Sequence, residues 1–133
     1  MEKKGLDLTI ILTTSYCRSC PNTGLIETVI RSFELVEGLS ECKLIVTCDG
    51  VKEISDQEYE EGQKYSKGRK KGFLSHSKVK DYREYISTLK SKSAAHERPF
   101  HNSYIMDLET HHGFTYAVKR ALAEVQTEFV MVV

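Results

Sequence analysis

A carboxylate, Asp49, stands directly after the apolar run KLIVTC and is followed by Gly50. An ionised carboxylate only accepts hydrogen bonds, so Asp49 could accept one from a nucleobase imide or a ribose hydroxyl. Gly50 has no side chain and would let the backbone turn away from such a ligand. The same two residues also make a good turn without any ligand, because Asp and Gly both favour turns, and both interpretations stay open.

Two further polar clusters follow apolar runs in the same manner. Thr13, Thr14 and Ser15 stand at the end of LTIILTTS, and His112 and Gly113 follow SYIMDL after a few residues. If a helix begins behind Gly113, its free N–H groups and its dipole would favour a phosphate, and His112 could touch that phosphate. A plain helix start needs no ligand and explains the glycine equally well.

The four cysteines permit three interpretations. Cys17 and Cys20 have the CxxC spacing of half a zinc site, but Cys42 and Cys48 are too widely spaced to supply the other half. A redox pair of this spacing opens a helix after the first strand, whereas here Pro21 follows directly. We therefore expect reduced thiols without a metal, with zinc binding and dithiol chemistry as the alternatives.

The pattern of apolar residues predicts the elements that must position these groups. Short runs of aliphatic residues predict buried strands at residues 8–14, 43–48, 103–108 and 128–133. Apolar residues at helical spacing predict helices at 25–36, 79–89 and 114–125, the second of them capped by Ser77. Apolar strands that alternate with helices predict an α/β fold, a mostly parallel, Rossmann-like sheet with helices on both faces. Ligands of such sheets bind beyond the carboxyl ends of the strands, where the polar clusters should meet.

Residues 51–100 break this pattern with opposed blocks of charge. An acidic stretch is followed by a basic one, Lys64–Lys80, and such blocks usually belong to a solvated excursion of the chain. We expect a loosely structured charged insertion within a single domain of residues 1–133. The basic block could bind the phosphates of a nucleic acid, but the acidic stretch before it favours a solvated loop, so nucleic acid is not an expected partner.

Length and composition describe one ordinary globular domain. The chain has 133 residues, of which 40% are hydrophobic and 29% are charged, and its 19 basic and 19 acidic residues balance. No charge excess indicates a nucleic acid or a membrane as partner. No apolar run is long enough for a membrane segment, and the N-terminus lacks the pattern of a signal peptide, so a cytoplasmic location is expected.

Taken in order, these motifs resemble the nucleotide-binding half of GT-A fold glycosyltransferases of the family-2 type. The resemblance rests on LTIILTTS, CKLIVTCDG and HHGFTYAVKRALAEVQTEFVMVV, and it covers residues 6–50 and 103–133. In that family a loop threonine and an Asp after the second strand contact the nucleotide, and a Gly-led helix precedes a strand that delivers a DxD motif. The DxD carboxylates hold a divalent metal on the donor diphosphate. They would follow Val133, so neither metal ligands nor a catalytic base is expected within this chain.

The resemblance implies a nucleotide-binding role for individual residues. The expected set is Thr13, Thr14, Ser15, Asp49, Gly50, His112, Gly113 and Lys119. Thr14 matches the loop threonine, Asp49 the base-contacting acid and Gly113 the helix-leading glycine. Lys119 falls at a usual Asn, so the diphosphate contact would pass to Lys119 or Arg120. The complete enzyme would bind a nucleotide-diphospho-sugar donor and transfer the sugar to an acceptor hydroxyl with Mn²⁺ or Mg²⁺.

Two other functions are compatible with the sequence. A sugar-nucleotide or cytidylyl transferase has a similar sheet, but SYCRSCPNTG does not match its Gly-rich basic loop. A non-catalytic α/β module could instead bind a protein or a nucleic acid through residues 64–80. Such a module would depend on Arg69, Lys70 and Lys71 and would be indifferent to Asp49, which is the reverse of the glycosyltransferase expectation.

Overall fold

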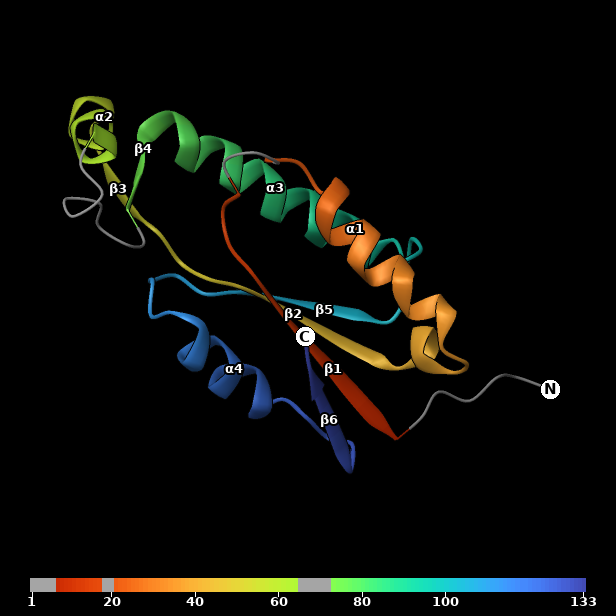
Figure 1. Cartoon of the computed structure of the whole chain (residues 1–133). Helices are drawn as coiled ribbons and strands as arrows, with labels where there is room; N and C mark the ends of the chain where they lie inside the picture. The colour runs from red at the N-terminus through yellow and green to blue at the C-terminus, as the bar shows by residue number, and fades with distance from the viewer. Residues whose placement is uncertain (1–6, 18–20, 65–72) are drawn as a thin grey trace.

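The computed structural model of the chain describes residues 7–17, 21–64 and 73–133, which form two sheets and the helices that cover them (Figure 1). The strands are β1 (Leu8–Thr14), β2 (Lys43–Cys48), β3 (Lys52–Ile54), β4 (Phe73–Ser75), β5 (Ser103–Asp107) and β6 (Phe129–Val132). The α-helices are α1 (Gly24–Arg31), α2 (Asp56–Lys64), α3 (His76–Ala94) and α4 (Phe114–Leu122). Two short 3₁₀ helices, η1 (Ser32–Leu35) and η2 (Leu39–Glu41), lead into β2.

The main sheet has four parallel strands in the order β5-β2-β1-β6. In the register of the sheet, Ile11 of β1 is paired with Ile45 of β2 on one side and with Val132 of β6 on the other. The chain adds β2 and then β5 on one side of β1, and afterwards returns to add β6 on the opposite side. The strand order therefore reverses between β1 and β6, the position where ligands bind in open sheets of this kind. The predicted α/β fold with a parallel sheet is confirmed.

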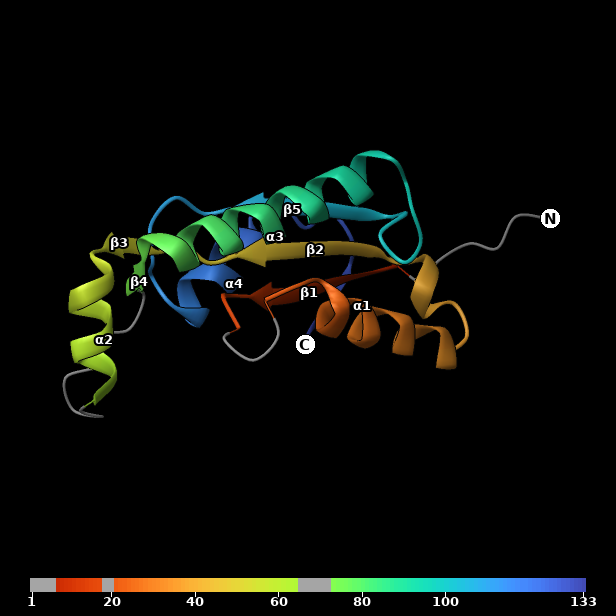
Figure 2. The ribbon, with the colours of Figure 1, turned by 90° about the horizontal axis from the view of Figure 1, so that it is seen from above.

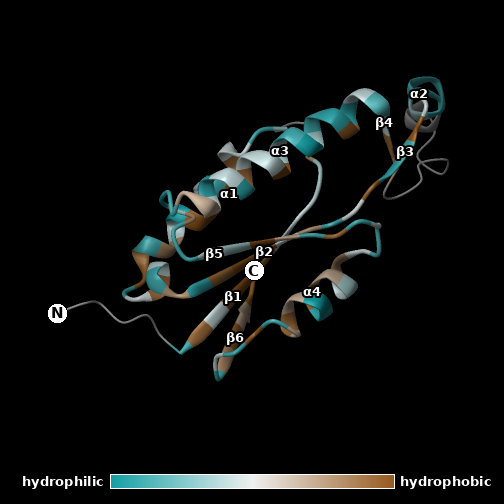
Figure 3. Cartoon of the chain, turned by 180° about the vertical axis from the view of Figure 1, so that it is seen from behind, coloured by the Kyte–Doolittle hydropathy of each residue, from teal (hydrophilic) through white to brown (hydrophobic). Residues whose placement is uncertain are grey.

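Helices cover both faces of this sheet, as Figures 1 and 3 show. Side chains alternate along a strand, so Ile10 and Leu12 of β1 point to one face and Ile11 points to the other. The first face packs against α1 and α3 and forms the larger core, which includes Tyr82 and Leu89 of α3. Of the described helices, α4 covers the second face, whose core is a small cluster of Ile11, Ile45, Met106 and Ala121. No helix in the described part of the chain is both long and apolar enough to cross a membrane.

The charged interval 51–100 contains more regular structure in its described parts than the one helix predicted at 79–89. β3 and β4 pair as a small parallel sheet beyond the carboxyl end of β2, and α2 lies beside them (Figure 2). The sequence of α2 is polar and shows no apolar period, and among the α2 side chains whose burial is described, that of Tyr59 is buried. Lys78 Nζ lies 4.7 Å from the centroid of that ring and attaches α2 to the first turn of α3.

Helix boundaries differ from the predicted ones where polar residues continue or end a helix. α1 tightens into η1 at Ser32 and the chain is extended at Val36, which the apolar spacing had placed inside the helix. α3 is capped at Ser75 rather than at Ser77, and it extends to Ala94 through residues too polar to show a period. α4 ends at Leu122, three residues before the predicted end.

β6 is an edge strand and is largely exposed, so the prediction of a buried final strand is wrong for this chain. Three of its four residues are exposed and Met131 is half-buried; Phe129 is 62% exposed. β1 covers one side of β6, and no described strand pairs with the other side. An apolar sequence predicts a strand correctly but does not tell whether a neighbour is present to bury it.

An ion pair joins the two helices on the first face. Lys92 Nζ of α3 donates to Glu27 Oε1 of α1 at 2.9 Å, and Thr23 Oγ1 donates to Glu27 Oε2 at 2.8 Å. Burial acts to raise the pKa of the Glu27 carboxyl, but the hydrogen bonds from Lys92 and Thr23 outweigh it, so that the pKa is lowered.

Lys92→Met should lower the free energy of unfolding by about 1 kcal/mol at about pH 7, because Glu27 loses its nearest cation. A carboxyl whose pKa is lowered by folding stabilises the protein fully at pH values above its ordinary pKa of 4.5. This contribution is lost as the pH falls through the lower pKa of the folded state. The difference between the variants should therefore shrink below pH 4.5, as measured by urea unfolding. Lys80→Met, an exposed lysine on the same helix, is the control, and an equal loss in both variants would contradict the assignment.

Candidate functional site

The loops that follow β1, β2 and β5 meet at the carboxyl end of the main sheet. Asp49 N donates to Thr14 O at 3.0 Å, and Leu108 N donates to Cys48 O at 3.0 Å, so each loop is tied to its neighbour by backbone. We call the residues 13–15, 49–50 and 109–113 the rim. The expected convergence of the polar clusters is thus present, and it follows from the parallel direction of the three strands.

Asp49 is the centre of the rim and is almost completely surrounded. Its Oδ2 lies 2.7 Å from Nδ1 of His111, and its Oδ1 accepts from Gly50 N at 2.9 Å and from His112 N at 3.3 Å. The Asp49 side chain is 11% exposed. Tyr82 Oη of α3 donates to the Asp49 carbonyl at 2.6 Å, and burial raises the pKa of this phenol above its usual value, which keeps it protonated. Three internal donors therefore hold the carboxylate that was expected, from the sequence, to contact a nucleobase.

Gly50 is required by a close approach of two loops. A Cβ at this position would lie 2.3 Å from the carbonyl carbon of Thr110 and 2.4 Å from its nitrogen, distances that real atoms do not adopt. The backbone of the loop after β5 therefore lies directly over Gly50. The sequence had suggested that this glycine clears room for a ligand, but the structure shows that the room is filled by Thr110.

Thr13, Thr14 and Ser15 line an open pocket of about 210 Å³ between the end of β1 and α1. Thr14 Oγ1 lies 2.7 Å from Tyr85 Oη of α3, and either oxygen can be the donor. Leu25 of α1 forms part of the wall and is 55% exposed. The pocket stands beside the point where the strand order reverses, so it is the best-placed hollow for a ligand of this sheet.

His112 and Gly113 lead into α4 as the sequence predicted. Gly113 has φ of +86°, which favours glycine, and a Cβ there would meet nothing within 4 Å. His112 Nε2 lies 2.6 Å from Thr110 Oγ1, and its ring centroid is 4.2 Å from that of Tyr116. Both residues thus belong to the rim, although the His112 side chain is already occupied by a hydroxyl and an aromatic ring.

Lys119 does not join the other predicted residues. It lies exposed in the last turn of α4, whereas the rim meets the first turn of that helix. A helix rises about 1.5 Å per residue, so Lys119 is displaced by more than one turn from Gly113. The helix begins at Phe114, as the apolar spacing predicts, so the distance of Lys119 from the rim follows from the sequence once the rim is placed.

The cysteines and acids of the described chain do not form a metal centre. No three His, Cys, Asp or Glu side chains are grouped to hold a metal ion among the residues that the structure describes. Cys20 of the CxxC pair lies outside those residues. Cys48 ends β2 in the core, where burial raises the pKa of its thiol to about 12 and removes it as a nucleophile.

The structure describes only part of the basic block, because Arg69, Lys70 and Lys71 lie outside the described residues. Of the described lysines, Lys78 is directed inward, with Nζ 5.9 Å from the Tyr16 ring centroid as well as close to Tyr59. Lys78 thus stabilises the fold rather than offering its charge to a partner.

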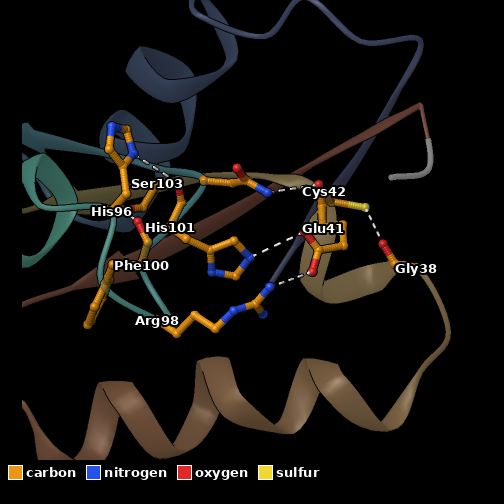
Figure 4. Close-up of polar contacts among 9 residues, drawn as sticks. Gly38, Glu41, Cys42, His96, Arg98, Phe100, His101 and Ser103 are labelled. Carbon is orange, nitrogen blue, oxygen red and sulfur yellow. Dashed lines mark hydrogen bonds and ion pairs between the residues drawn. The ribbon is translucent and has the colours of Figure 1, made fainter. Parts of the chain in front are cut away.

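A larger hollow, of about 620 Å³, lies at the opposite, amino end of the sheet. Beside it Glu41 Oε1 accepts from Arg98 Nη2 at 3.3 Å, and Glu41 Oε2 lies 3.5 Å from His101 Nε2 (Figure 4). This cluster ties the loop before β5 to η2. Volume alone favours the amino end, but ligands of parallel sheets bind at the carboxyl end, so we assign the candidate site to the rim.

Two aromatic residues and one histidine of the site were not predicted from the sequence. Tyr82 and Tyr85 project from α3 to contact Asp49 and Thr14, and the apolar period marked only Tyr82, as a core residue. The sequence indicated His112 rather than its neighbour His111. His111 and Asp49 are 62 positions apart, so their pairing leaves no local pattern in the sequence.

Gly50→Ala should lower the free energy of unfolding by about 1–3 kcal/mol, because the new methyl group meets the backbone of Thr110. Gly24→Ala is the control and should change the free energy of unfolding by less than about 1 kcal/mol, since its methyl group meets only the end of the Asn22 side chain, at 3.0 Å. Thermal and urea unfolding of both variants measure the difference. Equal losses would mean that the loop after β5 does not pack on Gly50 in solution.

Comparison of the chain with protein families, with curated proteins and with solved structures finds no match in any of the three.

Proposed function

We propose that this chain is the nucleotide-binding half of a glycosyltransferase and that the rim binds the nucleoside diphosphate of a sugar donor. The observation that supports this best is the reversal of strand order between β1 and β6, beside which hydroxyl, carboxylate and imidazole groups converge. Open parallel sheets bind ligands at such points. The resemblance of the sequence motifs to the family-2 type of GT-A fold selects a nucleotide-sugar among the possible ligands.

The pocket beside Thr14 gives the nucleoside a place to bind. It is open, it is lined by three hydroxyl-bearing residues of the β1 loop, and apolar side chains of α1 form its other wall. Small-molecule sites commonly combine an apolar wall with a few polar groups in this way. Thr14 keeps unused hydrogen-bonding capacity after its contact with Tyr85, because a hydroxyl has one donor and two acceptor positions.

The first turn of α4 is the proposed position of the diphosphate. The first N–H groups of a helix lack partners within the helix, and its dipole favours an anion there. Gly113 approaches this turn without a side chain. Lys119 is too far along α4 to replace the expected contact, so the backbone of the first turn takes the role that the resemblance assigned to a side chain.

The proposal for this chain is nucleotide binding without chemistry. The Mn²⁺ or Mg²⁺ ion that the resemblance implies finds no fitting set of three ligands among the described residues. Transfer of the sugar to an acceptor hydroxyl is proposed only for an enzyme that adds metal ligands and a general base to this half.

Calorimetric titration with UDP, GDP, CDP and ADP, with and without Mn²⁺, tests the proposal. We expect wild type to prefer one or two of the four nucleotides, and Asp49→Asn to weaken their binding by about tenfold, because an amide group replaces an acceptor at the centre of the rim. Glu37→Gln makes the same chemical change at an exposed site near the amino end of the sheet and should bind as wild type does.

Absence of binding by every nucleotide would refute the proposal. The interaction module of residues 64–80 would then become the leading hypothesis, and a triple change of Arg69, Lys70 and Lys71 would test it. Equal weakening by Asp49→Asn and Glu37→Gln would place the nucleotide away from the rim.

A further inference from the structure

The pair Asp49–His111 has a geometry that fixes the chemistry of the histidine. Asp49 Oδ2 and His111 Nδ1 are 2.7 Å apart, and the Asp49 side chain is otherwise held by the backbone N–H groups of Gly50 and His112. An ionised carboxylate has no proton to give, so Nδ1 must be the donor. A neutral imidazole with its proton on Nδ1 has a lone pair on Nε2, and His111 is therefore prepared as a hydrogen-bond acceptor.

Nε2 of His111 is available for a ligand. The His111 side chain is 30% exposed, and among the described residues its contact with Asp49 is made through Nδ1, not through Nε2. The carboxylate of Asp49 is far less accessible, because three donors already surround it. A ligand over the ends of β1 and β2 therefore meets the imidazole of His111 more readily than the carboxylate behind it.

We propose that His111 Nε2 reads the base of the bound nucleotide by accepting a hydrogen bond from a ring N–H, and that Asp49 is the residue that positions His111. This inference rests on the proposed function and names the class of base. Uracil and guanine present a ring N–H on their pairing edge, whereas cytosine and adenine present an unprotonated ring nitrogen there. Cytosine or adenine would therefore place an acceptor nitrogen against the acceptor Nε2 of His111. The hydrogen bond that is missing in this case lowers the affinity by about tenfold or more.

Two neighbouring contacts support a positioning role for Asp49. Tyr82 donates to the Asp49 carbonyl at 2.6 Å, and Thr110 of the loop bearing His111 packs directly on Gly50. The imidazole is thus held at one ring nitrogen, and the loop that carries it is packed against the loop after β2. A pre-oriented acceptor loses little conformational freedom on binding, which favours discrimination between bases.

Nitrogen-15 NMR of the histidine ring tests the first half of the inference without any ligand. Wild type should carry the His111 proton on Nδ1, and Asp49→Asn should lose this preference. A proton on Nε2 of His111 in wild type would overturn the inference whatever the protein binds.

Titration with UDP and CDP tests the second half. Wild type should bind UDP at least about tenfold more tightly than CDP, and His111→Ala should abolish this ratio. His111→Gln should keep most of the affinity but lose the discrimination, because an amide offers both a donor and an acceptor. His96→Asn, a histidine change at the other end of the sheet that tolerates the φ of 53°, should behave as wild type. Thermal unfolding confirms that each variant is folded.

The outcomes separate the two proposals. Binding of nucleotide with no preference between UDP and CDP, or with a preference that survives His111→Ala, would overturn the role of His111 and leave the donor site standing. No binding of any nucleotide by wild type would overturn the donor site and the base-reading role together.

Discussion

The loop after β5 is held over the end of β2, and the arrangement of the rim depends on this one contact. It has a steric part, since only glycine at position 50 admits the backbone of Thr110, and a polar part, since the Asp49 carboxylate gathers His111 and two backbone N–H groups. Each part requires the other. Without the glycine the loop could not come close enough to bond, and without the carboxylate the buried N–H groups would lose their acceptor.

The same contact determines where α4 lies. The loop that crosses Gly50 continues through Gly113 into the first turn of α4, and among the described elements α4 is the one helix on its face of the sheet. The opposite face has two helices joined by Glu27 and Lys92 and holds the larger core. Most of the apolar core therefore lies on one face of the sheet. On the other face, the position of α4 follows from the polar loop that leads into it.

Local sequence was sufficient for the strands and insufficient for the site. The first two strands were predicted to the residue, because runs such as LTIILTT are both apolar and bounded by polar residues. The polar ends of the strands followed from this and from the parallel order. The contact between Asp49 and His111 could not be predicted, since it depends on how a loop folds over a neighbouring strand. The close approach of Thr110 to Gly50 could not be predicted for the same reason: the sequence shows that a side chain is absent but does not show what occupies the space.

The exposed edge of β6 has a consequence for how the sheet can be enlarged. Phe129 N donates to Asp7 O just before β1, and Val133 N donates to Ile11 O of β1. The amide groups of Val130 and Val132 therefore point toward the open edge, where they could pair with a further strand. Such a strand would stand on the side of β1 opposite to β2 and β5. The number of strands in the sheet can therefore change without displacing any group that touches Asp49. In this architecture the sheet can become wider while the shape of the rim stays the same.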